Sequence, residues 1–115
     1  MNIQDTIRAI PDFPKPGILF RDISTMLLRP DAFAQAIDSM HAHFKDKGID
    51  AVAGIESRGF IFAAPLALKM NIPFILIRKP GKLPAETVSA EYSLDYGTDS
   101  IQMQKDAVTQ GLKVL

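Results

Sequence analysis

Two polar segments of the sequence carry residue types that suit a phosphate ligand. The first consists of Glu56, Ser57, Arg58 and Gly59, and the second contains the cations Arg78, Lys79 and Lys82. Exposed backbone N–H groups that lead into a helix, with an arginine beside them, favour a phosphate, and the clustered cations could neutralise a diphosphate. The alternative for both segments is a solvated strand exit followed by a positive loop.

The elements around these segments should bring them together. Residues 51–55 and 73–77 are short apolar runs typical of buried strands, and residues 60–70 have the composition of a buried helix. This order predicts a βαβ unit with two parallel strands and a right-handed connection. Ligands of an open parallel sheet bind at the carboxyl ends of its strands, which is where both polar segments begin.

The remaining chain predicts further elements on both sides of this unit. Residues 2–9 could form a short helix that Pro11 ends, and residues 11–17 should form a rigid, extended or turning segment. An apolar stripe predicts a helix that Asp31 caps and Gly48 follows. Residues 87–96 and 99–104 alternate loosely, with residues 96–99 as the turn between them, which indicates an antiparallel hairpin or flap. Residues 113–115 should begin a strand.

Composition excludes several classes of function. The chain has 115 residues and a net charge of zero, which argues against bulk electrostatic binding to nucleic acid or to an anionic membrane. It contains no cysteine and two histidines, so disulfides, thiol catalysis and a multi-histidine metal site are not expected. No apolar run approaches the roughly 20 residues of a membrane span, and residues 1–13 lack a signal-peptide pattern. We therefore expect a cytoplasmic protein of one domain.

Four segments, in this order and spacing, are more specific than either polar cluster alone. They are FPKPGILFRDIS, GIESRGFIFAAPLA, ILIRKPGKLPAET and YSLDYGTDSIQMQKDA. Together they resemble the adenine phosphoribosyltransferases, which are type I phosphoribosyltransferases, from about residue 7 to residue 115. The resemblance implies an α/β fold with a mostly parallel sheet, flanking helices, an N-terminal hood at residues 1–30 and a β-hairpin flap on a core at residues 31–115.

The resemblance also implies an activity and its site. Members of the family convert adenine and phosphoribosyl pyrophosphate to AMP and pyrophosphate, with Mg²⁺ carried by the diphosphate substrate, and they form homodimers. The hood positions that meet adenine match Leu19, Phe20 and Arg21. The pyrophosphate loop matches residues 56–59, with Arg58 also in a catalytic position, and Arg78, Lys79 and Lys82 match cations beside a flexible loop at about residues 79–93. That loop would close and exclude water.

Two features depart from the family pattern, the residue at position 95 and a missing segment. Asp95 stands where the family commonly has a glutamate that acts as acid and base on a purine ring nitrogen, although Asp95 could instead be a turn residue of the hairpin. Tyr96 could pack on the closed loop or fill a hairpin face. The acidic pair and glycine-rich loop that would hold the ribose and 5-phosphate are not found in residues 1–115.

These departures leave two alternatives for what the chain does. We expect it to be the N-terminal part of an adenine phosphoribosyltransferase, inactive when isolated. The alternative is a catalytically inactive module that binds a purine or a diphosphate weakly.

Overall fold

The computed structural model describes residues 1–115, which form two compact units, Met1–Ala42 and His43–Leu115. The first unit begins with a short 3-10 helix, η1 (Ile3–Thr6), and a two-stranded antiparallel sheet of β1 (Arg8–Pro11) and β2 (Leu19–Asp22). A one-turn helix, α1 (Ser24–Leu27), follows. Helix α2 (Pro30–Phe44) then crosses the boundary between the units. The division expected at residue 30 falls where α2 begins.

The prediction of a helix over residues 2–9 is wrong. Helical structure is limited to η1, and Ile7 already has an extended backbone with φ of −99°. The Asn2 side chain caps η1 by accepting a hydrogen bond from the Gln4 N–H at 3.1 Å. The isoleucines have helical spacing, but a helix this short, ended by Pro11, would leave most of its backbone N–H and C=O groups without partners. Pairing of β1 with β2 gives these groups hydrogen bonds instead, so the strand forms.

The proline-rich segment between β1 and β2 is a tight loop, as predicted. Asp12 has a positive φ of 56°, and its side chain accepts a hydrogen bond from the Gly17 N–H at 3.0 Å. The Phe13 N–H donates to the Ile18 carbonyl at 3.1 Å, and the Phe13 ring meets the Phe20 ring edge-on with centroids 5.1 Å apart. These contacts close the loop and set the start of β2.

Helix α2 confirms the predicted element but ends earlier than expected. Its last residue is Phe44, and a turn over residues 45–48 leads to Gly48, which has φ of +68°. The predicted cap is wrong, because α2 begins at Pro30 and Asp31 lies within its first turn. The Asp31 carboxylate accepts from the Ala32 N–H at 2.9 Å and pairs with Arg29 at 3.1 Å. The arginine is the main reason that the pKa of Asp31 is lowered.

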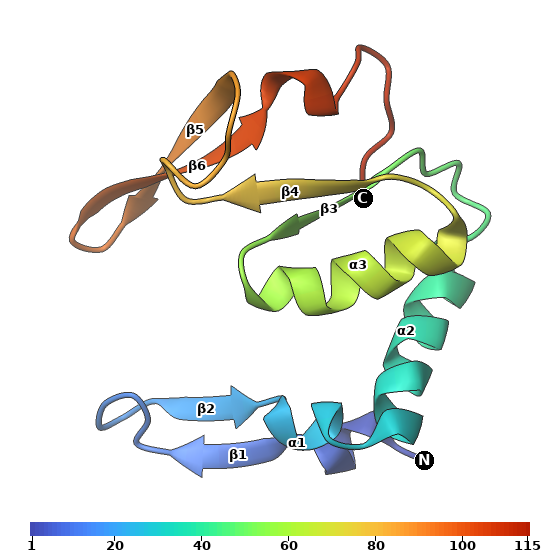
Figure 1. Ribbon diagram of the computed structural model, residues 1–115. Helices are drawn as coiled ribbons and strands as arrows, with labels where there is room; N and C mark the ends of the chain where they lie inside the picture. The colour runs from blue at the N-terminus through green and yellow to red at the C-terminus, as the bar shows by residue number, and fades with distance from the viewer. The chain divides into compact units, whose positions relative to one another are not determined.

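The second unit contains the predicted βαβ arrangement. Strand β3 (Val52–Ile55), helix α3 (Arg58–Met70) and strand β4 (Phe74–Arg78) follow one another, and β3 and β4 pair in parallel. Figure 1 shows α3 running along one face of these two strands. The sheet continues with β6 (Gly97–Gln104) and β5 (Thr87–Leu94), in the order β3-β4-β6-β5. Helix α3 begins two residues before the predicted start, so it includes Arg58 and Gly59.

Helix α3 lies unusually close to β3 because two glycines face each other. A Cβ atom on Gly54 would lie 2.8 Å from the Ala63 Cβ and 3.1 Å from the Gly59 carbonyl oxygen. Above this contact, Phe60 of α3 meets Phe74 of β4 edge-on at 5.6 Å. The buried residues of this layer are Val52, Gly54, Ala63, Leu66, Ala67 and Ile75. The close contact therefore fixes where α3 begins relative to the end of β3.

The hairpin is confirmed, but its predicted turn is wrong. Strands β5 and β6 form eight pairs that end at Leu94 opposite Gly97, so Asp95 and Tyr96 make the turn. Thr98 and Asp99, expected in the turn, are strand residues. By contrast, β6 pairs with β4 at only two positions, Ile77 with Met103 and Arg78 with Gln102. The hairpin therefore extends past the end of β4 (Figure 1).

Residues 113–115, expected to begin a strand, form only an isolated bridge beside the start of β3. Val114 forms a parallel bridge with Ala51, the Leu115 N–H donates to the Ala51 carbonyl at 3.0 Å, and the Ala53 N–H donates to the Leu115 carbonyl at 2.8 Å. A second 3-10 helix, η2 (Lys105–Ala107), joins β6 to this segment.

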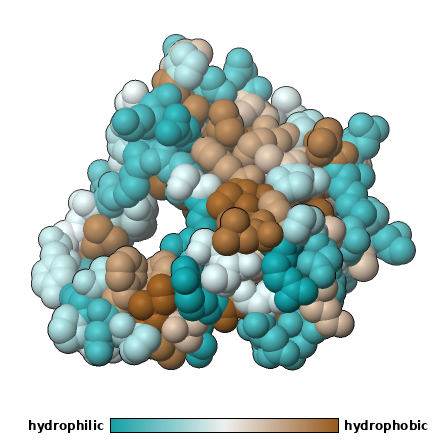
Figure 2. All heavy atoms as spheres, turned by 60° about the horizontal axis from the view of Figure 1, so that its bottom comes forward, coloured by the Kyte–Doolittle hydropathy of each residue, from teal (hydrophilic) through white to brown (hydrophobic).

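Both units expose large hydrophobic side chains. Leu28 is 80% exposed in the first unit and Leu68 is 83% exposed in the second. Figure 2 shows hydrophobic residues reaching the surface on the face that it draws. None of the helices is long and apolar enough to cross a lipid bilayer.

Candidate functional site

The carboxyl ends of β3 and β4 lie side by side, as the βαβ prediction requires. Ile55 is the register partner of Ile77, and the Glu56 N–H donates to the Ile77 carbonyl at 2.9 Å. The two polar segments therefore leave the sheet at adjacent positions. Glu56 and Arg78 meet directly at this edge, where the Arg78 Nε donates to the Glu56 Oε2 at 2.8 Å.

Glu56 organises the two strand ends. Besides Arg78, its Oε2 accepts a hydrogen bond from the Lys79 backbone N–H at 3.1 Å, and its side chain is only 18% exposed. The Lys79 N–H and then the Arg78 guanidinium lower the pKa of Glu56. The ionised carboxylate thus orients Arg78 and the first turn after β4, which is a positioning role; a carboxylate would repel a diphosphate rather than bind it.

Ser57, Arg58 and Gly59 lie at the start of α3, which begins at Arg58. The peptide bond between Glu56 and Ser57 is cis, Ser57 is the residue before the helix, and Ser57 and Arg58 are both exposed. No side chain caps this helix end, and its first turn has no acidic residue. Because the first N–H groups of a helix lack internal acceptors and carry partial positive charge, this end suits an anion.

Lys79 is held by residues that sequence reasoning did not single out. Its ammonium pairs with the Asp99 Oδ2 and lies 3.3 Å from the Tyr92 hydroxyl, which itself donates to the Asp99 Oδ2 at 3.2 Å. Asp99 is the main reason that the pKa of Lys79 is raised, and Lys79 is the main reason that the pKa of Asp99 is lowered. Tyr92 and Asp99 are direct register partners across the hairpin.

The segment expected as a flexible loop at residues 79–93 consists of two parts. Residues 87–93 belong to β5, and residues 79–86 lie along β6. The Gly81 N–H donates to the Gln102 Oε1 at 3.3 Å, and the Gln104 Nε2 donates to the Pro84 carbonyl at 3.3 Å. The third cation of the cluster, Lys82, is exposed.

Asp95 and Tyr96 are not brought to the strand ends. They occupy the tip of the hairpin, where Asp95 is exposed and Tyr96 is 96% exposed. Gln102 lies beside Arg78, so at about 3.3 Å per residue the tip is roughly 20 Å along β6 from the basic cluster. Any shared chemistry of Asp95 and Arg78 requires the hairpin to bend towards the strand ends.

The predicted adenine positions lie together on β2 in the first unit. Leu19 is 52% exposed and Arg21 is exposed, while Phe20 points the other way and packs on Phe13. Arg21 lines a hollow with Gln4 and Ile7. The strand thus offers an apolar and a cationic side chain on one side, which suits a planar polar ring.

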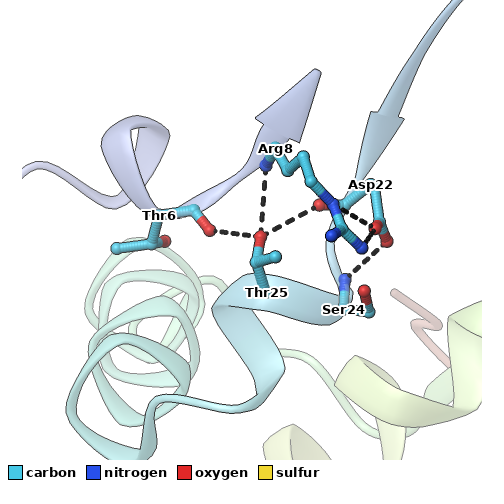
Figure 3. A network of polar contacts seen from close by, with 5 residues as sticks. All are labelled: Thr6, Arg8, Asp22, Ser24 and Thr25. Carbon is cyan, nitrogen blue, oxygen red and sulfur yellow. Dashed lines mark hydrogen bonds and ion pairs between the residues drawn. The ribbon is translucent and has the colours of Figure 1, made fainter. Parts of the chain in front are cut away.

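A polar network at the base of this sheet holds β2 in place (Figure 3). Asp22 accepts from Arg8 Nε at 3.0 Å and from the Ser24 N–H at 2.9 Å. Thr25 donates its hydroxyl to the Thr6 carbonyl at 2.6 Å and accepts from the Arg8 N–H at 3.1 Å. The bonds from Ser24 and Arg8 lower the pKa of Asp22 to about 2. This network, which sequence reasoning missed, fixes the strand that carries Leu19 and Arg21.

Comparison with curated proteins gives close relatives over the whole chain. The chain is 58% identical over 113 residues to the adenine phosphoribosyltransferase of Treponema denticola, covering 98% of this chain and 60% of the relative. It is 55% identical over 115 residues to that of Kosmotoga olearia, covering 100% of this chain and 68% of the relative. No family model matches the chain. The alternative of an inactive binding module is not favoured by these relatives.

Solved structures agree with the fold. The adenine phosphoribosyltransferase of Thermoanaerobacter pseudethanolicus superposes with a TM-score of 0.93 at 49% identity, covering 97% of this chain and 65% of that one. The enzyme of Saccharomyces cerevisiae, solved with adenine and an imino-altritol bisphosphate, gives a TM-score of 0.92 at 37% identity, covering 97% and 66%. The type I phosphoribosyltransferase-like fold expected from the sequence is thereby confirmed.

Proposed function

The chain belongs to the adenine phosphoribosyltransferase family, and on this premise we propose that the protein transfers a phosphoribosyl group from phosphoribosyl pyrophosphate to adenine. The products are AMP and pyrophosphate, a purine-salvage reaction. The observation that carries the proposal is the identity of 55% over all 115 residues to a relative of this name. The paired strand ends, with Arg78 and Lys79 beside the open start of α3, supply a matching anion site.

The diphosphate would bind at the carboxyl ends of β3 and β4. Arg58 can form paired hydrogen bonds to phosphate oxygens, and Arg78, Lys79 and Lys82 add positive charge on the other side. Glu56 keeps Arg78 in place by its 2.8 Å contact. Fixed cations at this point would stabilise the negative charge that develops on pyrophosphate as it leaves the ribose.

Mg²⁺ would enter with the diphosphate as part of the substrate. Within residues 1–115, no group of three or more His, Asp or Glu side chains lies close enough to hold a metal ion. Glu56, the carboxylate nearest the strand ends, already accepts from Arg78 and Lys79. This donor set suits a metal that is held by the oxygens of the diphosphate.

Adenine would bind at the hood. Leu19 offers an apolar contact for a face of the base, and Arg21 and the backbone of β2 offer polar contacts to its edge. Phe20, packed on Phe13, would support the strand from behind. In the reaction, a ring nitrogen of adenine attacks the ribose carbon while the carbon–pyrophosphate bond breaks, and the carboxylate of Asp95 would accept the proton that the neighbouring ring nitrogen loses.

We further propose a cytoplasmic homodimer. The exposed apolar side chains of the second unit, Ile55 at 49% and Leu68 at 83%, supply surface that a second copy could cover. Light scattering of the purified protein at several concentrations tests the dimer, and a monomeric mass throughout would contradict it.

The activity is tested with a version of the protein that spans the whole length of its relatives, of which residues 1–115 cover 60% and 68%. The assay measures AMP formation from labelled adenine, phosphoribosyl pyrophosphate and Mg²⁺. We expect AMP and pyrophosphate in equal amounts, and no nucleotide when hypoxanthine replaces adenine. Folding of the protein under the assay conditions is checked by circular dichroism. A folded protein that forms no AMP over a range of both substrates would refute the proposed function.

A further inference from the structure

Asp99 and Tyr92 contact the ammonium of Lys79, and neither of them binds a substrate in the proposed reaction. Lys79 is the first residue after β4, and its ammonium contacts both the Asp99 carboxylate and the Tyr92 hydroxyl. It also lies 6.0 Å from the centroid of the Tyr92 ring, within the range of a cation–π contact. All three groups of this cluster are therefore satisfied by one another.

The position of this cluster in the sheet is unusual. The ladder between β4 and β6 ends at Arg78 and Gln102, and Asp99 lies three residues further along β6, on the part of the hairpin that extends past β4. The ion pair therefore ties the end of β4 to the protruding part of the hairpin. At the tip of that same part lies Asp95.

The two partners of the ion pair differ in how firmly they are held. The second oxygen of Asp99 accepts from the Ser100 N–H at 2.8 Å, so the carboxylate is fixed on β6. The Lys79 side chain is 44% exposed, and its ammonium is held by the Asp99 carboxylate and the Tyr92 hydroxyl. Lysine is a flexible chain with a point charge, so Lys79 is the partner that can exchange.

The Arg78–Glu56 pair at the same edge is different. Glu56 is 18% exposed and also accepts from the Lys79 backbone N–H, so this pair is part of the strand-end structure. Asp99, at 32% exposed, is more open to solvent and to a competing anion. Of the two basic side chains at the strand ends, Lys79 is thus the one whose charge an incoming ligand can take over.

We propose that Asp99, supported by Tyr92, is a positioning residue that holds Lys79 on the hairpin in the empty protein and competes with the diphosphate for it. The proposal rests on the proposed function, in which Lys79 binds that diphosphate. Binding moves the ammonium from Asp99 to the phosphate oxygens. The tie between β4 and the hairpin is then broken, and the arm that carries Asp95 is released to bend towards the site.

The competition is tested by calorimetric titration with magnesium pyrophosphate. Asp99→Asn removes the competing charge and should lower the dissociation constant about two- to fivefold, the range of exposed ion pairs. Asp99→Glu keeps the charge and should restore the wild-type value. Tyr92→Phe should lower the dissociation constant less than Asp99→Asn does. The KM for adenine should stay unchanged in all three variants.

A double variant separates this effect from a general change of charge. In the Lys79→Ala background, Asp99→Asn should no longer alter pyrophosphate affinity. Asp106→Asn, an exposed carboxylate beyond the other end of β6, is the matched control for lost negative charge and should leave affinity at the wild-type value. Thermal melts of each variant identify any that fails to fold.

Several results would overturn the proposal. Affinity that is unchanged or weaker in a folded Asp99→Asn variant would exclude competition for Lys79. Equal tightening by Asp106→Asn, or tightening that persists without Lys79, would assign the effect to overall charge. Absence of pyrophosphate binding by the wild-type protein would also overturn the proposal. AMP formation is measured separately, and it shows whether the proposed function fails together with the proposed competition or holds without it.

Discussion

The contact between Gly54 and α3 predicts a large difference between two similar substitutions. In Gly54→Ala, the new methyl group would lie 2.8 Å from the Ala63 Cβ and 3.1 Å from the Gly59 carbonyl oxygen. Neither neighbour is the end of a flexible side chain, so the helix itself must shift away from β3. Overpacking of this kind costs about 1–3 kcal/mol. We therefore expect Gly54→Ala to lower the free energy of unfolding by that amount.

Gly59→Ala is the matched control, because it places a methyl group on the opposite side of the same contact. Its Cβ would lie 3.5 Å from the nearest Gly54 atom, which is an ordinary van der Waals distance. Alanine is favoured over glycine inside a helix by about 1 kcal/mol, so Gly59→Ala should leave stability unchanged or raise it slightly. The same added methyl group should therefore lower the free energy of unfolding at position 54 but not at position 59.

The assay is chemical denaturation with urea, followed by circular dichroism, for both variants and for Gly54→Ala combined with Ala63→Gly. The double variant removes the shortest contact, so its loss of stability should be smaller than the sum of the two single losses. Equal stability of Gly54→Ala and Gly59→Ala would refute the account of the packing. Additive losses in the double variant would show that Ala63 is not the group that meets the new methyl.

Three further predictions concern the site and the hood. The first two apply to a version of the protein that spans the whole length of its relatives. Arg58→Ala should raise the KM for phosphoribosyl pyrophosphate about tenfold or more, because a charge-assisted bond is lost, and leave adenine affinity unchanged; a change confined to adenine would move Arg58 to the purine site. Asp95→Ala should lower kcat by roughly 10²–10⁴, and Asp95→Glu should keep activity, whereas an unchanged kcat in Asp95→Ala would make Asp95 a turn residue only. Folding lowers the pKa of Asp22 from its ordinary 3.8 to about 2, so its ionised form stabilises the hood above pH 3.8 and this contribution is lost as the pH falls towards 2. The melting temperature of Asp22→Asn should therefore depend less on pH across that window than the melting temperature of the wild type or of the control variant Asp46→Asn. Parallel curves of melting temperature against pH would contradict the role of Asp22 in stabilising the hood.

The strand-end part of the site could be predicted from the sequence because the signals there are local. Two apolar runs, a helix between them and a polar break after each run imply parallel strands whose carboxyl ends meet. The pairing of Ile55 with Ile77 and the contact of Glu56 with Arg78 follow from that arrangement. What the pattern does not indicate is that the Glu56 carboxylate accepts hydrogen bonds from both Arg78 and the Lys79 N–H.

The base of the hood could not be predicted in the same way. The spacing of Ile3, Ile7 and Ile10 fits a helix, but the structure has an extended strand from Arg8. Its conformation depends on residues that lie 14 or more positions away, since Arg8 bonds to Asp22 and to Thr25. A periodicity within ten residues carries no information about such partners, so the long-range bonds decide the outcome.

A small error in the predicted turn of the hairpin hides the contacts among Lys79, Tyr92 and Asp99. A turn over residues 96–99 would place Asp99 at the start of the returning strand and Tyr92 within the other strand, with no reason for the two to meet. A turn of Asp95 and Tyr96 makes Tyr92 and Asp99 direct partners, and side chains of paired residues lie on one face. Gly97, with φ of +142°, accepts the backbone conformation that this shorter turn requires. Both groups then lie on the face that Lys79 contacts, so the Lys79–Asp99 ion pair depends on the turn rather than on any motif around the lysine.

For the same reason, lengthening the turn by one residue would move Asp99 out of register with Tyr92 and should abolish the competition for Lys79 while leaving Glu56 and Arg78 paired.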